Sequence, residues 1–171
     1  KVLLLEDGTW KYVKPEVPDT TVSLECSDLI LVTEDKVSGA KHTSSNGSIV
    51  ISDDGETGFA ILLLNYKKNS LVIRITAIGA GNCIDDDDKM NIRFRDGTRC
   101  EMINNGKFNC DPKFTLYFGG NFGKNKQLEM LRTKGIKTMR IWTNDSYVER
   151  DFSETQSNQF MKTIDCLIQA R

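Results

Sequence analysis

The chain has 171 residues and a net charge of −1, which excludes several classes of protein. This length is enough to bury a hydrophobic core within one domain. The balance of 23 basic and 24 acidic residues creates no global field that would attract nucleic acid or an anionic membrane. Aliphatic runs such as LLL at 3–5 and ILLL at 61–64 are too short to cross a bilayer. We therefore expect no nucleic-acid partner and no membrane span.

The first residues, KVLLLEDGTWKYV, predict a small β-hairpin. A two-residue loop at 7–8, Asp-Gly, would place Leu3 opposite Tyr12. The following KPEVPDT contains two of the three prolines and is typical of a linker. We therefore expect an N-terminal hairpin appendage at 1–14 and a single domain at 20–171.

The segment from 22 to 57 gives weaker signals. VSLECSDLILV at 22–32 is apolar enough for one or two strands. Residues 33–57 are polar and rich in turn residues, so we expect a long irregular segment there. Short strands are expected within it at 40–44 and 48–52.

An antiparallel meander from Gly58 to Phe118 is the centre of the predicted fold. Phe59–Tyr66 is nearly continuous in apolar residues, which is typical of a strand covered on both faces. Leu71–Ile78 alternates apolar with other residues, which predicts a half-buried strand.

The turns between 94 and 110 can be tested by side-chain parity. A three-residue loop at 104–106 would pair Met102 with Phe108 and Cys100 with Cys110, and it segregates apolar from charged side chains. A two-residue loop at Asp96-Gly97 does not fit this phase. Either a bulge or a longer loop restores it, or the strand limits differ.

Two helices and a hairpin are predicted to follow the meander. NKQLEMLRTK at 125–134 predicts a short helix that Gly135 ends. Ile136–Thr143 and Ser146–Phe152 predict a β-hairpin.

The C-terminal helix is the clearest local pattern in the chain. Ser153 with Gln156 forms a capping-box sequence. One apolar stripe follows it, made of Phe160, Met161, Ile164, Leu167 and Ile168. The predicted fold class is therefore α+β: a twisted antiparallel β-meander with two helices, the C-terminal one packed on the sheet.

Five cysteines, at 26, 83, 100, 110 and 166, fit no zinc-binding pattern. They are either free thiols in a cytosolic protein or one or two disulfides with one thiol left over in an exported one. Cys166 lies opposite the apolar stripe of its helix. It is therefore either a thiol near a frayed end or bridged from the far side, with Cys83 as the expected partner.

The stretch KGIKTMRIWT contains the main candidate binding residues. On a strand, residues 138, 140 and 142 share one face, and 137, 139 and 141 share the other. Arg140 and Trp142 would then either pack on each other, which is the favoured interpretation, or form an exposed basic and aromatic patch that could meet a glycan or single-stranded nucleic acid. The near-neutral net charge weakens the nucleic-acid alternative. Lys124, in the glycine-rich FGGNFGKN before a helix, is a candidate anion contact, although the phosphate-loop spacing is absent.

No catalytic or metal constellation is predicted. The four adjacent carboxylates at 85–88 lack the spacing of a calcium loop, so we expect a solvated loop. His42 is the only histidine and lies in a polar stretch with no positioned partner. We therefore expect no cofactor, no metal site and no assigned catalytic residue.

Two stretches resemble known exported proteins. VLLLEDGTWKYV resembles the short DDGTW-type hairpin near the start of many exported bacterial proteins. CIDDDDKMNIRFRDGTRCEMINNGKFNC through KTMRIWTNDSYVERDFSETQSNQFMKTIDCL resembles an uncharacterised domain of Bacteroidetes-type exported proteins. In that pattern the positions of Cys83, Cys110 and Cys166 recur and Cys100 is outside it. The resemblance implies export, to the periplasm, the outer membrane or the medium.

The leading functional expectation is an exported, non-catalytic module that binds a protein or a component of the cell envelope. The alternative is a hydrolase that acts through carboxylates on an envelope or polysaccharide substrate.

Overall fold

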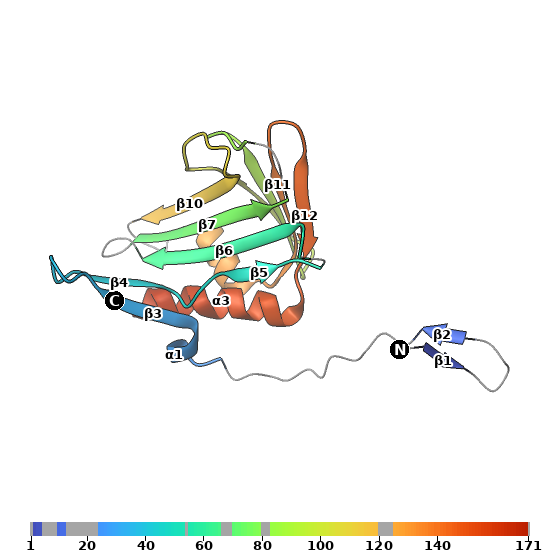
Figure 1. The fold of residues 1–171 in the computed structure, drawn as a ribbon, viewed down its shortest axis with the longest axis horizontal. Coiled ribbons are helices and arrows are strands. Elements are labelled where there is room, and N and C mark those ends of the chain that lie inside the picture. Colours follow the sequence, from blue (N-terminus) through green and yellow to red (C-terminus); the bar gives the residue numbers. More distant parts are fainter. Residues whose placement is uncertain are drawn as a thin grey trace.

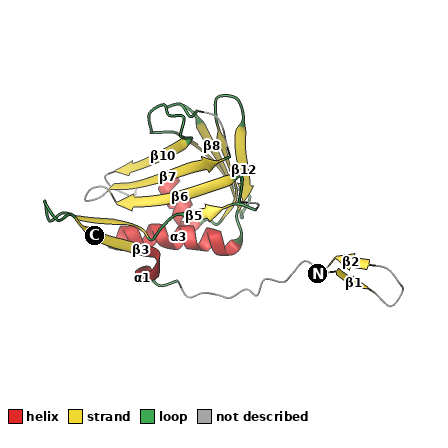
Figure 2. Ribbon diagram, viewed as in Figure 1, coloured by secondary structure: helices red, strands yellow, loops and turns green. Residues whose placement is uncertain are grey.

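The fold is α+β, with antiparallel sheets and a C-terminal helix packed against one of them (Figures 1 and 2). It is known from a computed structural model that describes residues 2–4, 10–12, 24–53, 55–65, 70–79, 83–119 and 125–170. Strands β1 (Val2–Leu4) and β2 (Trp10–Tyr12) form an antiparallel hairpin. In it Leu3 pairs with Lys11 rather than with Tyr12. The last pair is Leu4 with Trp10, so the connection is longer than the two-residue loop that was expected.

The first large sheet has the strand order β10-β7-β6-β4-β3, and β5 also pairs with β6. All its pairings are antiparallel. Its strands are β3 (Ile30–Glu34), β4 (Lys41–Ser45), β5 (Ile49–Ile51), β6 (Gly58–Asn65), β7 (Ser70–Ile78) and β10 (Lys113–Gly119). The short strands expected at 40–44 and 48–52 are thus confirmed as β4 and β5.

The second large sheet has the order β12-β11-β8-β9, so the chain leaves the first sheet after β7 and returns to it for β10. Its strands are β8 (Lys89–Phe94), β9 (Arg99–Ile103), β11 (Ile136–Trp142) and β12 (Tyr147–Asp151). The predicted meander is therefore divided between two sheets, and the predicted β-hairpin, β11–β12, completes the second of them.

Three helices are present in the described part of the chain: α1 (Cys26–Leu29), α2 (Lys126–Thr133) and α3 (Glu154–Gln169). The predicted capping box is confirmed, because Ser153 Oγ accepts from Gln156 N and Gln156 Oε1 accepts from Ser153 N. Helix α3 lies along β4, β5 and β6 (Figure 1). Asn65 and Gln156 hold it there through hydrogen bonds to Leu167 O and Val50 O.

One hydrophobic core fills the space between the sheets and helices α2 and α3. The first sheet contributes alternate residues such as Phe59, Ile61 and Ile73, and the second contributes Ile92 and Ile141, all fully buried. The intervening residues of β6, Ala60, Leu62 and Leu64, are only half-buried. The expectation that this strand is covered on both faces is therefore wrong, since nothing described covers its outer face.

The disulfides are Cys26–Cys166 and Cys83–Cys110, and Cys100 is a free thiol. Of the two alternatives for Cys166, the bridge is the one present, but the expected partner Cys83 was wrong. Helix α1 contacts α3 and supplies Cys26 there, a helix that the apolar pattern of 22–32 did not predict. The Cys100–Cys110 pairing was also wrong, because β9 pairs with β8 and not with the segment after residue 106.

The loop between β8 and β9 resolves the mismatch in side-chain parity that a two-residue loop at 96–97 would create. Phe94 N donates to Thr98 O, and Ile92 pairs with Cys100, so the loop is longer than two residues. Met90, Ile92 and Phe94 consequently face the core together with Met102, as the longer-loop alternative requires.

Asparagines complete the outer edge of β10. Asn104, which is 2% exposed, accepts from Thr115 N through Oδ1 and donates to Asp85 O through Nδ2. Asn105 Oδ1 accepts from Tyr117 N. These side chains satisfy backbone groups that an edge strand otherwise leaves unpaired.

Among the helices in the described ranges, none is long and apolar enough to span a membrane.

Candidate functional site

The outer face of the second sheet holds the densest group of polar and aromatic side chains in register. On each strand the apolar residues point to the core, so the alternate residues point outward. The pairings align three rows across the strands β12, β11, β8 and β9. These rows are Asp151–Thr138–Arg93–Arg99, Glu149–Arg140–Asn91–Glu101, and Tyr147–Trp142 followed by Lys89–Ile103.

This face is hollowed into a depression of about 770 Å³. The residues that line it come from all four strands and are Asn91, Ile92, Arg93, Arg99, Cys100, Glu101, Lys137, Thr138, Arg140, Glu149 and Asp151. A second hollow of about 420 Å³ continues from it at Asn91 and Glu101. That hollow is lined in addition by Asp87, Asp88, Lys89 and Trp142. We call the two together the sheet-face groove.

The predicted pair Arg140 and Trp142 lies in this groove and is joined by Tyr147. The Arg140 guanidinium carbon lies 5.3 Å from the Trp142 ring centroid and 4.4 Å from that of Tyr147. The two ring centroids are 5.2 Å apart. Arg140 Nε also donates to Glu149 Oε2 at 2.7 Å. The guanidinium is thus held between two aromatic rings and a carboxylate, an arrangement that fixes its position.

Hydrogen bonds across the strands fix the middle of the groove. Trp142 Nε1 donates to Asn91 Oδ1 at 2.7 Å, and Asn91 Nδ2 donates to Glu101 Oε2 at 3.2 Å. Lys89 Nζ pairs with Glu101 Oε1 at 3.0 Å. Hydrogen bonds from Lys89 and then Asn91 hold the pKa of Glu101 below its usual value. The polar groups in the middle of the groove are therefore held in place by one another.

Positively charged side chains lie at the end of the groove that is farther from Trp142. Arg93 on β8 and Arg99 on β9 are paired directly across the strands, and both are exposed. Neither guanidinium group forms a hydrogen bond or ion pair with a residue in the described ranges. Like charges placed opposite each other in a sheet are destabilising.

Lys137 joins this end because β11 contains a bulge. The register passes from Ile136 opposite Phe94 to Thr138 opposite Arg93, which leaves Lys137 as an extra residue. Lys137 and Thr138 consequently both line the groove. The expectation that 137 faces away from 138 was wrong for this reason. We call Arg93, Arg99 and Lys137 the basic end of the groove.

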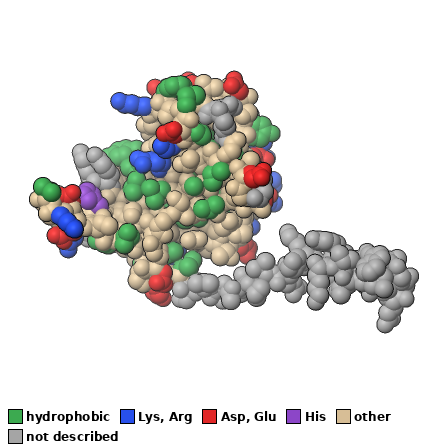
Figure 3. Space-filling view, viewed as in Figure 1, with side chains coloured by type: hydrophobic (Ala, Val, Ile, Leu, Met, Phe, Trp, Pro, Cys, Tyr) green, Lys and Arg blue, Asp and Glu red, His purple; other side chains and the backbone are tan. Residues whose placement is uncertain are grey.

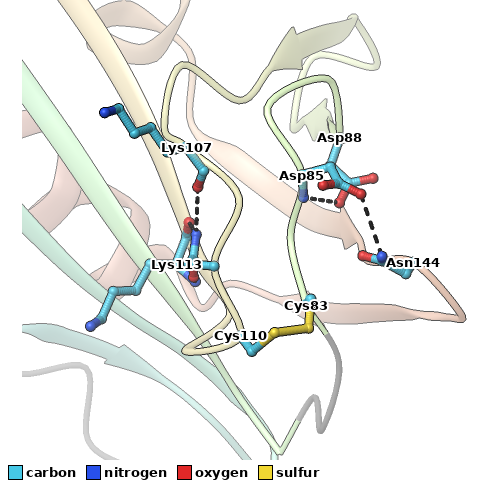
Figure 4. Close-up of a disulfide and its surroundings, with 8 residues drawn as sticks. Cys83, Asp85, Asp88, Lys107, Cys110, Lys113 and Asn144 are labelled. Carbon is cyan, nitrogen blue, oxygen red and sulfur yellow. Dashed lines mark hydrogen bonds between the residues drawn. A yellow bond between two sulfur atoms is a disulfide. The ribbon is translucent and has the colours of Figure 1, made fainter.

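The acidic run 85–88 forms a tight turn beside the second disulfide (Figure 4). Asp85 N donates to Asp88 Oδ2 at 2.8 Å, and Asn144 Nδ2 donates to Asp85 Oδ2 at 3.4 Å. Asp86 and Asp87 are exposed, so part of the run is solvated as expected. Within the described residues, no group of three or more His, Cys, Asp or Glu side chains is placed to hold a metal ion.

The other predicted residues lie away from the groove or outside the described residues. Lys124 is among the residues that the structure does not describe. His42 is exposed on β4, opposite Thr33 of β3. Cys100 borders the groove, but burial, and secondarily the charge of Glu101, raises the pKa of its thiol and makes it a poor nucleophile.

The outer face of the first sheet offers a contrasting surface. Figure 3 shows hydrophobic side chains over the middle of this face. Leu62, Leu64 and Val72 are half-buried there, and Tyr117 is 53% exposed. These residues have few hydrogen-bonding groups, so this face provides a natural comparison for experiments on the groove.

Most residues of the groove were not predicted from the sequence, which indicated only Arg140 and Trp142. The alternation in KMNIRF already placed Asn91 and Arg93 on the face opposite the core, and YVERD did the same for Glu149. The missing information was that β8 and β11 are neighbours, because their pairing joins segments that are distant in sequence.

The chain matches no protein-family model, and comparison with curated proteins and with solved structures likewise gives no match.

Proposed function

We propose that this protein is an exported, non-catalytic module that binds a glycan of the cell envelope in the sheet-face groove. The observation that carries the proposal is the groove itself: a depression of about 770 Å³ whose polar side chains are held in place across four strands. Side chains positioned before a ligand arrives lower the ordering cost of binding.

The chemistry of the lining favours a hydroxyl-rich ligand. Interface cores between proteins are depleted in charged residues, whereas carboxylates, guanidinium groups and an amide line this groove. Asn91, Glu101 and Arg140 offer donors and acceptors at the centre, and Trp142 and Tyr147 offer ring surface at one end. Many hydrogen-bonding groups beside an aromatic surface suit a saccharide better than an apolar peptide.

The cysteines support the exported location. Disulfides persist in oxidising compartments and are rare in the cytosol. Cys26–Cys166 and Cys83–Cys110 account for four of the five cysteines, and Cys100 is half-buried. The same two bridges are compatible with periplasmic, outer-membrane-associated and secreted proteins.

The carboxylates of the groove are less well suited to hydrolysis than to binding. A glycosidase needs one carboxyl group that stays protonated to act as the acid. The pKa of Glu101 is instead lowered by Lys89 and Asn91. Glu149 is paired with Arg140, and Asp151 accepts from the Thr138 hydroxyl. Each of these three carboxylates is thus engaged by a donor on the same face.

A glycan microarray of bacterial envelope and storage polysaccharides tests the proposal. We expect the wild-type protein to bind a subset of the glycans, Trp142→Ala to lose that binding, and Tyr117→Ala to keep it. Tyr117 is a matched control because it is an exposed aromatic residue on a strand of the other sheet. Arg140→Gln serves as a second groove variant if Trp142→Ala folds poorly. No bound glycan, or binding lost in Tyr117→Ala and retained in both groove variants, would reject the proposal.

A further inference from the structure

We infer that the basic end of the groove binds a single anionic group at the terminus of the glycan, either the carboxylate of an acidic sugar or a sulfate or phosphate ester. This inference rests on the proposed function, because it specifies the ligand of the same groove. It is carried by the juxtaposition of Arg93, Arg99 and Lys137 around Thr138.

Charge pairing inside the groove leaves these cations without a side-chain partner in the part of the chain that the structure describes. Glu101 is engaged by Lys89, and Glu149 is engaged by Arg140. Arg93, Arg99 and Lys137 form no ion pair or side-chain hydrogen bond with any residue in the described ranges. A bound anion would remove the repulsion between the two directly opposed arginines.

The hydrogen-bond donors at the basic end are groups that bind anions well, and they come from adjacent strands. Two guanidinium groups on adjacent strands present fixed forks of N–H donors, which bind carboxylate or phosphate oxygens in a bidentate manner. The bulge at Lys137 turns a third cation to the same face, and bulges often re-aim a side chain beside a binding site. The Thr138 hydroxyl in the same row donates to Asp151, so the three cations supply the donors for the ligand.

The neighbouring carboxylates limit the ligand to one charge at its end. Glu149 and Glu101 lie in the middle row of the groove, Asp151 lies at the β12 edge of the row that holds the two arginines, and Asp87 and Asp88 border the far hollow. A ligand with negative charges repeated along its length would meet these carboxylates. A neutral chain ending in one anionic group meets the cations with its terminus and the hydrogen-bonding centre with its hydroxyl groups.

Matched glycans test this inference. The array would carry each bound neutral glycan beside the same glycan ending in a carboxylated sugar, the same glycan ending in a sulfate or phosphate ester, and a repeating polyuronate. We expect the singly charged forms to bind at least about tenfold more tightly than the neutral parent and than the polyuronate, because charge-assisted hydrogen bonds are added. The two charged arms show which anion is preferred.

Variants assign the effect to the basic end. Arg93→Gln with Arg99→Gln should abolish the preference, measured as the ratio of the affinities for the charged and the neutral glycan within the same variant. Arg74→Gln is the matched control, because Arg74 is an exposed arginine on the central strand β7 of the other sheet. Equal binding of neutral and charged forms, or an unchanged preference in the double variant, would overturn the inference while leaving the proposed function intact.

A second measurement decides the inference even if the array binds nothing and the proposed function fails. Glucuronate and sulfate would be added separately to the protein while the arginine Nε–H signals are followed by NMR. We expect the Arg93 and Arg99 signals to shift with saturation in at least one titration, and the Arg74 signal to stay in place. Equal shifts at all three arginines, or none, would overturn the inference.

Discussion

Trp142 on β11 donates its indole N–H to Asn91 Oδ1 on β8 at 2.7 Å, so the two residues lock the ring against the neighbouring strand. We predict that Asn91→Ala releases this ring and weakens glycan binding several-fold, while the free energy of unfolding falls by less than about 1.5 kcal/mol. The indole N–H signal in NMR spectra, assigned with Trp142→Phe, should move and exchange faster with solvent. Asn46→Ala, which removes another exposed amide, is the control. An unmoved indole signal in Asn91→Ala would contradict the prediction.

The long-range disulfide should matter most for stability. Cys26–Cys166 spans 140 residues of sequence, whereas Cys83–Cys110 spans 27. We predict that the Cys26→Ser, Cys166→Ser double variant loses about 2–5 kcal/mol of unfolding free energy in guanidinium titrations. The Cys83→Ser, Cys110→Ser variant should lose about 1.5 kcal/mol less unfolding free energy, because the Cys83–Cys110 disulfide closes a shorter loop. Cys100→Ser is the control with an intact framework, and an equal loss there would refute the account of the bridges.

The buried side chain of Asn104 should be far more sensitive than its neighbour. Asn104 links the 85–88 turn to β10 and is 2% exposed, while Asn105 is exposed. Asn104→Ala leaves the Thr115 N–H without its partner and leaves the Asp85 carbonyl only the 3.4 Å hydrogen bond from Asp88 N, so we predict a loss of about 2–4 kcal/mol. Asn105→Ala should cost less than about 1.5 kcal/mol. Urea titration of the two variants measures the difference, and similar losses would argue against the role of Asn104.

Asp96 should make the β8–β9 turn sensitive to acid. Hydrogen bonds from Lys134 and then Thr98 lower the pKa of this carboxyl group from 3.8 to about 2. A carboxyl group whose pKa is lower in the folded state stabilises the fold above its unfolded pKa, and that contribution is lost as the pH falls through the folded value. We therefore predict that the difference in melting temperature between wild type and Asp96→Asn shrinks between pH 4 and about 2. An NMR titration that places the Asp96 pKa near 3.8 would be inconsistent with this contact.

Local patterns predicted most of the secondary structure but not the division into two sheets. The capping box at Ser153 and the alternation of Leu71–Ile78 depend on neighbouring residues, and both are confirmed. The switch of the chain between sheets after β7 depends on pairings between distant strands, which parity cannot reveal. Helix α1 was missed because four residues carry too little periodicity to separate a helix from a strand.

The candidate site was predictable at two residues and hidden at the rest. Arg140 and Trp142 share a strand face, so simple alternation brought them together. Arg93 and Arg99 belong to a different hairpin, and only the β8–β11 pairing places them beside Thr138. The bulge at Lys137 reversed its expected face, and the sequence contains no glycine or proline there to signal it. Cys166 is bridged, but its partner depended on the unpredicted α1.

The most direct test of the account is to map the amide chemical shifts of the protein as an array-selected glycan is added. We predict that the shifts cluster on β8, β9, β11 and β12, with the largest changes near Asn91, Arg140 and Trp142. Shifts that cluster instead around Leu64 and Tyr117 on the first sheet would place the binding surface on the opposite part of the fold. That result, or the absence of any shift, would contradict the assignment of the sheet-face groove as the glycan site.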